Sequence, residues 1–329
     1  MTPQPAPKQV ITRAQWVAAD AALREALSRF ASQARFEEEF LRAFLIYWSA
    51  EDEEDLPIDL EHVDPDSEEF LLTFEWFVYD YRESESGKRI IDLFAEAEGP
   101  RLPALQRQLL EAWRQQCIDL YEVHRIEDGR RYHVLRVMTG QEYAVDDEPS
   151  AGSLAPGDLL AVRLLPVGER WYPSTLFRSF SPADLPRLTA TLRLSYEDFQ
   201  QEHPGASWEE FLRENGFLFN DYTLERRALA EAWHERGTEP PAPADEEREP
   251  SARDRRRWET ALRQAYEQWL ERPSPALDMQ TPLEAASDPQ LRPRLKDILQ
   301  QMEEIEASFA WAGEPALDWK AFIREKGLL

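Results

Sequence analysis

The sequence predicts an α+β protein, mainly α, with helical N-terminal and C-terminal parts around a small five-stranded antiparallel β-barrel. Three observations support this prediction. Apolar and aromatic side chains recur at steps of three and four along most of the 329 residues, as they do on one face of an α-helix. Between residues 119 and 180 the pattern changes to short runs rich in Val, Tyr and Leu. After residue 180 the helical spacing returns.

Residues 1–118 are predicted to form an N-terminal helical region. Its second helix carries four aromatic residues at steps of four, which places them on one face: Phe36, Phe40, Phe44 and Trp48. The segment "FLLTFEWFVYDYR" continues this aromatic spacing. Because such stripes usually face a core, we expect several helices packed around shared aromatic side chains.

Residues 119–180 are predicted to form the β module. Five short segments have strand composition: "LYEVHRIE", "RRYHVLRVM", "QEYAVDD", "GDLLAVRLLPVG" and "RWYPSTLF". Asp-Gly, Thr-Gly, Pro-Gly and Val-Gly-Glu punctuate them, as tight turns do. No helical pattern separates the strands, which favours antiparallel pairing. The size is that of an SH3-like or OB-like barrel.

The remaining chain is predicted in three pieces. Residues 181–236 form a helical region that packs on the first two parts, 237–250 form a Pro-rich linker, and 251–329 form a C-terminal helical module. The linker carries four prolines within a mixed charge run. In the last module, Thr281-Pro282-Leu283-Glu284 combines an N-cap, a first-turn proline and a capping glutamate.

Charge and composition narrow the function classes. The formal net charge of −26 repels nucleic acid and anionic membrane surfaces, so we expect neither as a direct partner. No stretch of 18 uncharged apolar residues occurs, so no membrane span is predicted. The single cysteine, Cys117, cannot form an internal disulfide, which is consistent with a cytoplasmic location.

Two histidines suggest a possible zinc site. If Asp128-Gly129 forms a two-residue turn, His124 lies directly opposite His133, with Cβ atoms roughly 5 Å apart. Both imidazoles could then reach one zinc ion, and Glu122, on the same face, could supply a third ligand. The alternative is an ordinary cross-strand pair that binds no metal and needs no cofactor.

The segment from Trp269 to Glu303 resembles the C-terminal toxin-binding domain of Xre/MbcA/ParS-type antitoxins. The matching residues are Trp269, Leu270, Pro273, Pro275, Leu277, Thr281, Pro282, Leu283 and Glu284. The resemblance implies a protein partner that contacts Trp269, Leu277, Thr281, Pro282 and Leu283. Asp278-Met279-Gln280 replaces the Gly-rich turn of that family, and no N-terminal helix-turn-helix is evident.

The β region, together with the upstream "FEWFVYDYR", is similar to uncharacterised bacterial proteins associated with SEC-C motifs. The Cys-rich SEC-C motif itself is absent, since the chain has one cysteine. This resemblance implies an architecture and no particular activity.

No nucleophile elbow, zinc-protease, Walker or dinucleotide-binding pattern occurs. We therefore expect a non-catalytic, cytoplasmic protein-interaction or regulatory protein, antitoxin-like through its C-terminal module. One alternative is a metal-dependent protein or enzyme that uses His124 and His133. Another is an acidic mimic of nucleic acid, because a strongly acidic surface can occupy nucleic-acid-binding proteins.

Overall fold

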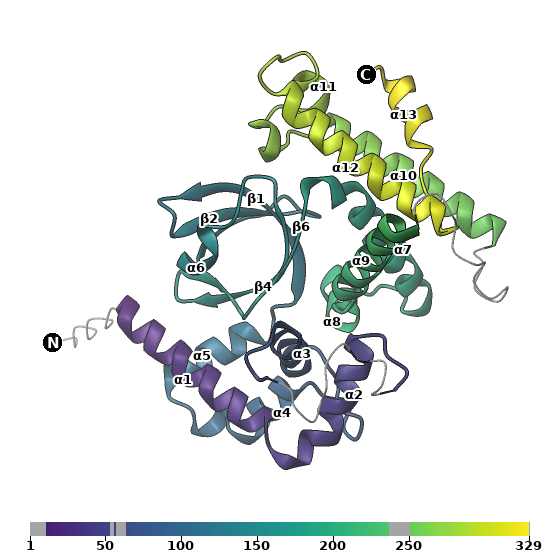
Figure 1. The fold of residues 1–329 in the computed structure, drawn as a ribbon. Coiled ribbons are helices and arrows are strands. Elements are labelled where there is room, and N and C mark those ends of the chain that lie inside the picture. Colours follow the sequence, from purple (N-terminus) through teal and green to yellow (C-terminus); the bar gives the residue numbers. More distant parts are fainter. Residues whose placement is uncertain (1–10, 53–55, 57–63, 237–250, 329) are drawn as a thin grey trace.

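A computed structural model describes residues 11–52, 56, 64–236 and 251–328. Figure 1 shows N-terminal helices below a central β-barrel and further helices beside and above it, so the predicted fold class is confirmed. Within the described residues, no helix has the length and apolar composition needed to cross a membrane. The predicted linker, residues 237–250, lies outside the described residues.

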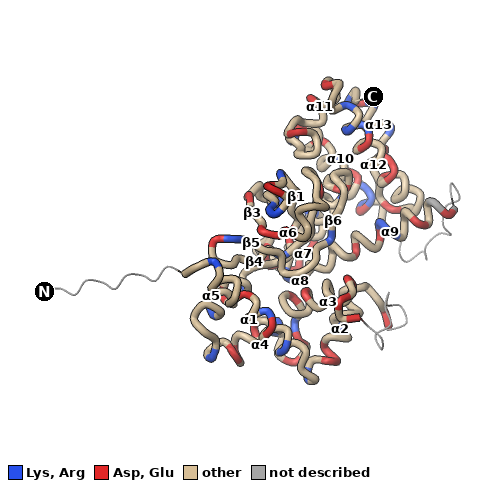
Figure 2. Tube along the Cα trace, turned by 60° about the vertical axis from the view of Figure 1, so that its left-hand side comes forward, with Lys and Arg blue, Asp and Glu red and all other residues tan. Residues whose placement is uncertain are grey.

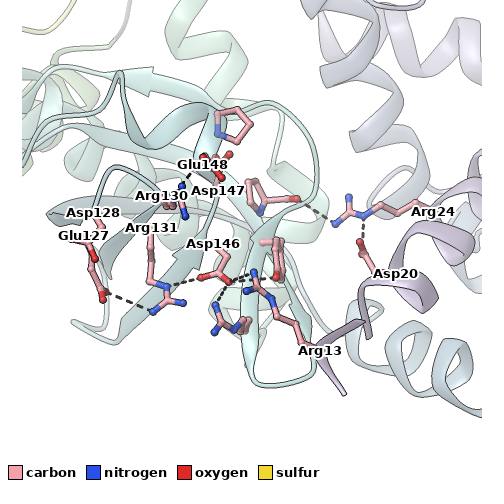
Figure 3. A pocket seen from close by; sticks show the side chains of 14 residues that line it. Arg13, Asp20, Arg24, Glu127, Asp128, Arg130, Arg131, Asp146, Asp147 and Glu148 are labelled. Carbon is pink, nitrogen blue, oxygen red and sulfur yellow. Dashed lines mark hydrogen bonds and ion pairs between the residues drawn. The ribbon is translucent and has the colours of Figure 1, made fainter. Parts of the chain in front are cut away.

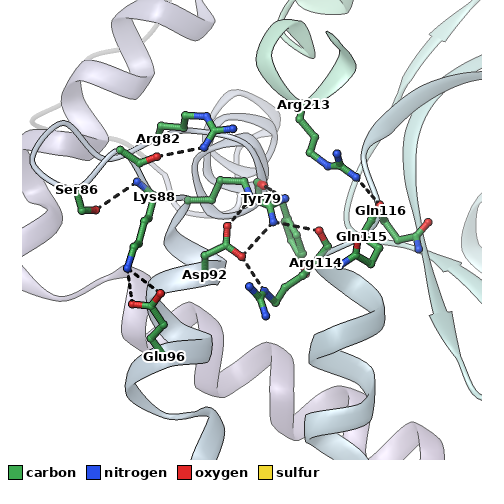
Figure 4. A network of polar contacts seen from close by, with 12 residues as sticks. Tyr79, Arg82, Ser86, Lys88, Asp92, Glu96, Arg114, Gln115, Gln116 and Arg213 are labelled. Atoms are coloured by element: carbon green, nitrogen blue, oxygen red, sulfur yellow. Dashed lines mark hydrogen bonds and ion pairs between the residues drawn. The ribbon is translucent and has the colours of Figure 1, made fainter. Parts of the chain in front are cut away.

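The N-terminal helices surround an aromatic core. They are α1 (Arg13–Ala31), α2 (Glu37–Tyr47), α3 (Glu68–Tyr79), α4 (Ile90–Ala97) and α5 (Ala104–Trp113), with short 3-10 turns at Ala34–Phe36 and Gly99–Arg101. Phe36, Phe44 and Trp48 of the predicted stripe are buried in this core, and Phe40 packs against it. Asp92 joins α4 to α5, because both Arg89 and Arg114 donate to its carboxylate (Figure 4).

Six strands form one sheet. They are β1 (Ile118–Glu127), β2 (Arg131–Arg136), β3 (Glu142–Asp146), β4 (Leu159–Val167), β5 (Arg170–Pro173) and β6 (Arg178–Phe180). Their order is β1-β2-β3-β5-β4-β6, and β1 also pairs with β4. Five strands thus close into a barrel, with β6 added at the edge of β4, and the short helix α6 (Glu148–Ala151) connects β3 to β4.

The barrel is mixed, whereas the sequence predicted a purely antiparallel one. β3 and β5 pair in parallel at Val145 and Trp171, while the other pairs are antiparallel. The parallel pair arises because β4 crosses over to β1, which leaves β5 beside β3. A closed five-stranded barrel of this kind has the SH3-like or OB-like size that the sequence predicts. Its interior is filled by side chains such as Val123, Tyr132 and Leu160.

Arg163 attaches the barrel to the N-terminal helices. Its side chain is fully buried, and its Nε donates to Glu75 Oε1 at 2.6 Å. A second guanidinium nitrogen bonds to Asp80 at the end of α3, and Nη1 donates to the carbonyl oxygen of Gln116 at 2.8 Å. Arg163 therefore joins β4 of the barrel to α3 and to the segment between α5 and β1.

The helices after the barrel share one further core. They are α7 (Leu185–Glu202), α8 (Trp208–Asn215), α9 (Leu218–Arg236), α10 (Ala252–Glu271), α11 (Pro282–Ala285), α12 (Arg292–Trp311) and α13 (Trp319–Lys326), with 3-10 turns at Pro182–Asp184 and Pro275–Leu277. This core reaches Leu120 and Leu159 on the barrel and extends to Phe322 and Ile323 in α13. Helices on both sides of residues 237–250 therefore pack together.

Candidate functional site

A large hollow lies at the mouth of the barrel, where α1 approaches the β1–β2 hairpin. Its volume is about 740 Å³. We call it the mouth pocket; the residues that line it are Arg13, Asp20, Arg24, Glu127, Asp128, Arg130, Arg131, Asp146, Asp147, Glu148, Pro149, Arg170, Tyr172 and Pro173. Figure 3 shows these side chains, which come from α1, the β1–β2 hairpin, the end of β3, the start of α6, and β5. Arginines and carboxylates dominate the lining.

Asp146, at the end of β3, is the carboxylate at which three guanidinium groups meet (Figure 3). Arg131 Nε donates to Oδ1 at 2.6 Å, and Arg13 Nη2 donates to Oδ2 at 3.2 Å. Arg170 donates to the same Oδ2, and the Tyr172 hydroxyl lies 3.4 Å from it. Although burial raises it, the bonds from Arg131 and Arg170 hold the pKa of Asp146 below its usual value.

The charge around Asp146 is unbalanced. Three guanidinium groups surround one carboxylate that stays ionised, and Arg131 also lies 3.7 Å from Glu127, which leaves an excess of one positive charge at this point. Two of the three arginines also face solvent, since the side chains of Arg13 and Arg170 are 63% and 37% exposed. Guanidinium groups carry five N–H donors each, so donors remain for a further anion.

The opposite rim of the pocket is acidic. Asp147 caps α6 by accepting from the Ser150 backbone N–H at 3.3 Å, and it also accepts from the Tyr132 hydroxyl at 3.1 Å. Glu148 lies 3.4 Å from Arg130. The pocket as a whole thus has a cationic wall at Asp146 and an acidic rim, which suits a ligand with an anionic group and hydrogen-bond donors.

The sequence of α1 explains how Arg13 reaches the barrel. Thr12 and Gln15 form a capping box that begins the helix at Arg13. The Trp16 ring then lies against Gly168 in the β4–β5 turn, where a Cβ atom would come within 2.8 Å of Trp16 Cδ1. Gly168 has a φ of +66°, so glycine serves both the turn and the close approach of the ring.

Arg24 fixes α1 to β5 about three turns beyond Arg13. Its Nε donates to Asp20 at 2.9 Å, and its Nη2 donates to the carbonyl oxygen of Pro173 at 3.4 Å. Its guanidinium also lies over the Trp113 ring, 5.2 Å from the centroid. These contacts use most of the Arg24 donors for structure, so Arg13, Arg131 and Arg170 are the stronger candidates for binding.

The predicted opposition of His124 and His133 is wrong. Strand β1 has a bulge between Val123 and Arg125, so Arg125 lies opposite His133 and His124 is left out of the ladder. His133 contacts two carboxylates instead, since its Nε2 lies 2.9 Å from Glu127 Oε2 and its Nδ1 lies near a glutamate of β3.

The hairpin turn also differs from the predicted one, because it shifts the register of β1 and β2 by one residue. Asp128 and Gly129 have the positive φ values of the expected turn, 52° and 63°. The strand register nevertheless pairs Glu127 with Arg131, so Arg130 belongs to the turn and not to the ladder. This shift of one residue exchanges the faces of the strand, and the bulge then shifts the register back, so that Val123 pairs with Val134.

Glu122 and His124 both face the C-terminal module. Glu122 is 2% exposed and accepts from Arg272 at 2.5 Å. His124 Nε2 lies 3.1 Å from the Met279 sulfur. Burial raises the pKa of Glu122 to about 7, with Arg272 opposing the shift. Among the described residues, no three His, Cys, Asp or Glu side chains form a group that could hold a metal. The predicted zinc ligands therefore serve separate contacts.

The five predicted partner-binding residues are mostly structural. Trp269 and Leu277 are 4% and 0% exposed within the core of the C-terminal helices. Thr281 forms the predicted capping box with Glu284, and Pro282 is buried. Leu283 alone of the five is exposed, at 44%. A partner of this segment would meet Leu283 and not the buried aromatic side chain.

The residues of the mouth pocket were missed by sequence reasoning. Arg131, Asp146 and Arg170 are separated in the chain and meet only because β3 pairs with both β2 and β5. Arg13 comes from a different part altogether. The available signal was the run of like charges at strand ends, "RR" at 130–131 and "DDE" at 146–148. Such runs are also found on any solvated turn, so they do not identify a site alone.

Residues 55–208 match the profile of a family of unknown function (DUF7986). The matched part is a little under half of the chain. It contains the whole barrel, and hence the part of the mouth pocket that lies between Glu127 and Pro173, but not α1. Neither the curated proteins nor the solved structures yielded a match to this chain.

Proposed function

We propose that this chain is a non-catalytic binding protein whose mouth pocket holds a small polar ligand with an anionic group. The observation that carries the proposal is the convergence of Arg13, Arg131 and Arg170 on Asp146. A carboxylate or phosphate would supply the negative charge that this cluster lacks. Arginine pairs with such groups through two parallel N–H bonds, which gives affinity and orientation together.

The size and chemistry of the pocket define the class of ligand. A volume of about 740 Å³ lies within the range of small-molecule sites. The lining is charged, which favours a polar metabolite over an apolar one. The acidic rim, with Asp147 and Glu148, suits hydroxyl or ammonium groups of the same ligand. OB-type barrels bind ligands beside their β1–β2 and β4–β5 loops, which is an analogy of fold alone.

Binding is favoured over chemistry by the fixed charges in the pocket. A general acid or base works best with a pKa near neutral pH, whereas the pKa of Asp146 is held below its usual value. The lining residues include no serine, cysteine or histidine that could act as a nucleophile. The arrangement therefore provides oriented charges and donors.

Two features bear on where the protein works and what it contacts. The buried, free thiol of Cys117 supports a cytoplasmic location. Figure 2 shows Asp and Glu spread over all parts of the fold with Lys and Arg among them. A nucleic-acid mimic needs its acidic side chains along one face, so this distribution favours the binding role over mimicry.

A ligand panel with the full chain tests the proposal. We expect phosphate, pyrophosphate, sugar phosphates and polycarboxylates to raise the melting temperature, because a ligand that binds only the folded state stabilises it. Neutral polyols and sodium chloride at matched ionic strength are the controls. At about 100 times the dissociation constant, stabilisation is about 2.7 kcal/mol, or several degrees. The proposal fails if no anion exceeds the chloride control.

A further inference from the structure

A second surface of the molecule is a groove along the outer face of α12. One hollow of about 440 Å³ is lined by Trp233, Leu299, Ala307, Trp319 and the polar residues between them. A second hollow of about 410 Å³ is lined by Ser287, Pro289, Arg292, Pro293 and Lys296. Lys296 lines both, so the hollows adjoin. From Arg292 to Ala307 the groove follows the helix for roughly 22 Å.

The groove has opposite charges at its two ends. Arg292 and Lys296 lie toward the N-terminal end of α12, and within the described residues neither has an ion-pair partner. Glu303 and Glu304 lie toward the C-terminal end. Glu303 has only a long contact with Lys320, at 3.7 Å between two exposed side chains. Arg292 and Lys296 can therefore pair with carboxylates of another molecule.

The two ends of the groove also differ in shape. The half-buried ring of Trp233 lies beside the C-terminal end of α12, with its centroid 5.8 Å from that of Trp311. The hollow at the N-terminal end is walled by Pro289 and Pro293 and is mostly apolar. The Trp233 indole and the proline-lined hollow are both apolar, but they lie at opposite ends of one helix and cannot meet within one chain.

A two-fold axis brings the complementary ends together. If a second copy lies antiparallel with the axis between Leu299 and Gln300, Lys296 of each copy faces Glu303 of the other. The same rotation places each Trp233 at the Pro289–Pro293 hollow of the other copy. A two-fold contact uses the same surface on both subunits, so each complementary contact occurs twice in the dimer.

We propose that the α12 groove binds a second copy of this chain and forms an antiparallel homodimer. The net charge opposes association at long range, but at about 0.15 M salt charges farther apart than roughly 8 Å are screened. The short-range contacts across the two-fold axis then decide whether two copies associate. The helix face is small beside a standard interface of about 800 Å² per partner, so the dimer is weak and reversible.

Sedimentation of the full chain between about 1 and 100 µM tests the proposal, since weak dimers dissociate in this range. We expect concentration-dependent dimers of the wild type. Lys296→Glu and Glu303→Lys should each weaken dimerisation at least tenfold, because each creates two like-charge contacts. Trp233→Ala should weaken it as well. Arg29→Glu reverses an exposed arginine of α1 and should change nothing.

Restoration experiments separate this interface from general charge effects or misfolding. The double variant Lys296→Glu/Glu303→Lys should dimerise like the wild type, because the swapped charges face each other across the axis. A mixture of the two single variants should form heterodimers. A wild type that stays monomeric throughout, single reversals that have no effect, or a double variant that stays as weak as the singles would each overturn the proposal.

Discussion

Arg187 and Glu306 form a buried, bidentate ion pair in which both N–O distances are 2.9 Å. The two side chains are 3% and 1% exposed. Glu306 also accepts from the Tyr266 hydroxyl at 2.9 Å and from the Leu317 backbone N–H at 2.6 Å. The pair therefore ties α7, which precedes residues 237–250, to α10 and α12, which follow them.

We predict that Arg187→Met strongly destabilises the protein. The substitution leaves Glu306 buried without its cation, and breaking a buried pair in this way costs about 3–5 kcal/mol. Chemical denaturation of the full chain, followed by tryptophan fluorescence, measures the loss. Arg227→Ala is the control, because Arg227 and Glu231 are 77% and 64% exposed and such a pair contributes about 0–1 kcal/mol. Equal effects of the two substitutions would contradict the assigned role of the buried pair.

Gly157 should tolerate a methyl group much less well than Gly129. Both have positive φ values, +97° and +63°. A Cβ on Gly157 would lie 2.5 Å from the Ala276 Cβ, at the contact between the barrel and the C-terminal helices, whereas a Cβ on Gly129 meets nothing within 4 Å. Gly129→Ala should cost about 1–2 kcal/mol from backbone strain alone. Gly157→Ala should cost about 1–3 kcal/mol more from overpacking.

Thermal unfolding of the two alanine variants under identical conditions compares these costs directly. Both variants share the same chemical change, so the difference reports the contact with Ala276 together with the extra backbone strain at +97°, which lies outside the usual left-handed region. Equal melting temperatures for the two would show that the barrel and the C-terminal helices do not pack as described.

The contribution of Glu122 to the free energy of unfolding should decrease as the pH rises from acidic to mildly alkaline values. Burial raises its pKa from 4.5 to about 7, so the folded state holds the proton more tightly than the unfolded state. That contribution is fully present below pH 4.5 and is lost as pH rises through about 7. It amounts to as much as about 3 kcal/mol.

Glu122→Gln removes this titration while leaving an oxygen that can accept from Arg272. We predict that stability relative to the wild type rises with pH between about 5 and 8 in this variant, as measured by denaturation at each pH. Glu267→Gln, at an exposed partner of Lys326, should give no comparable slope. A difference curve for Glu122→Gln that is flat over this range would contradict the raised pKa.

Much of the fold was predictable because helical periodicity and helix capping depend on residues that are close together in the sequence. The aromatic residues from Phe36 to Trp48, spaced four apart, align on one face as soon as a helical segment forms. The capping residues Thr281 and Glu284 interact over three positions. The closure of the barrel was less predictable from the sequence. The parallel pairing of Val145 with Trp171 joins strands that are not neighbours in the chain, and no local pattern encodes it.

The candidate site was less predictable than the fold for the same reason. The bulge at His124 has no composition signal, yet it moves this side chain away from His133. The mouth pocket depends on tertiary contacts, such as Trp16 against Gly168, that bring Arg13 to Asp146. Sequence reasoning identified the strands that carry the pocket but not the meeting of their ends.

The most direct test of the proposed function is calorimetric titration of the full chain with pyrophosphate and, separately, with citrate. We predict measurable binding by the wild type. Arg13→Ala and Arg170→Ala should each weaken it about tenfold or more, since each loses a charge-assisted contact. Asp146→Asn should tighten it, because the resident negative charge no longer competes. Arg29→Ala should leave it unchanged. Absence of binding, or one affinity for all four variants, would contradict the account.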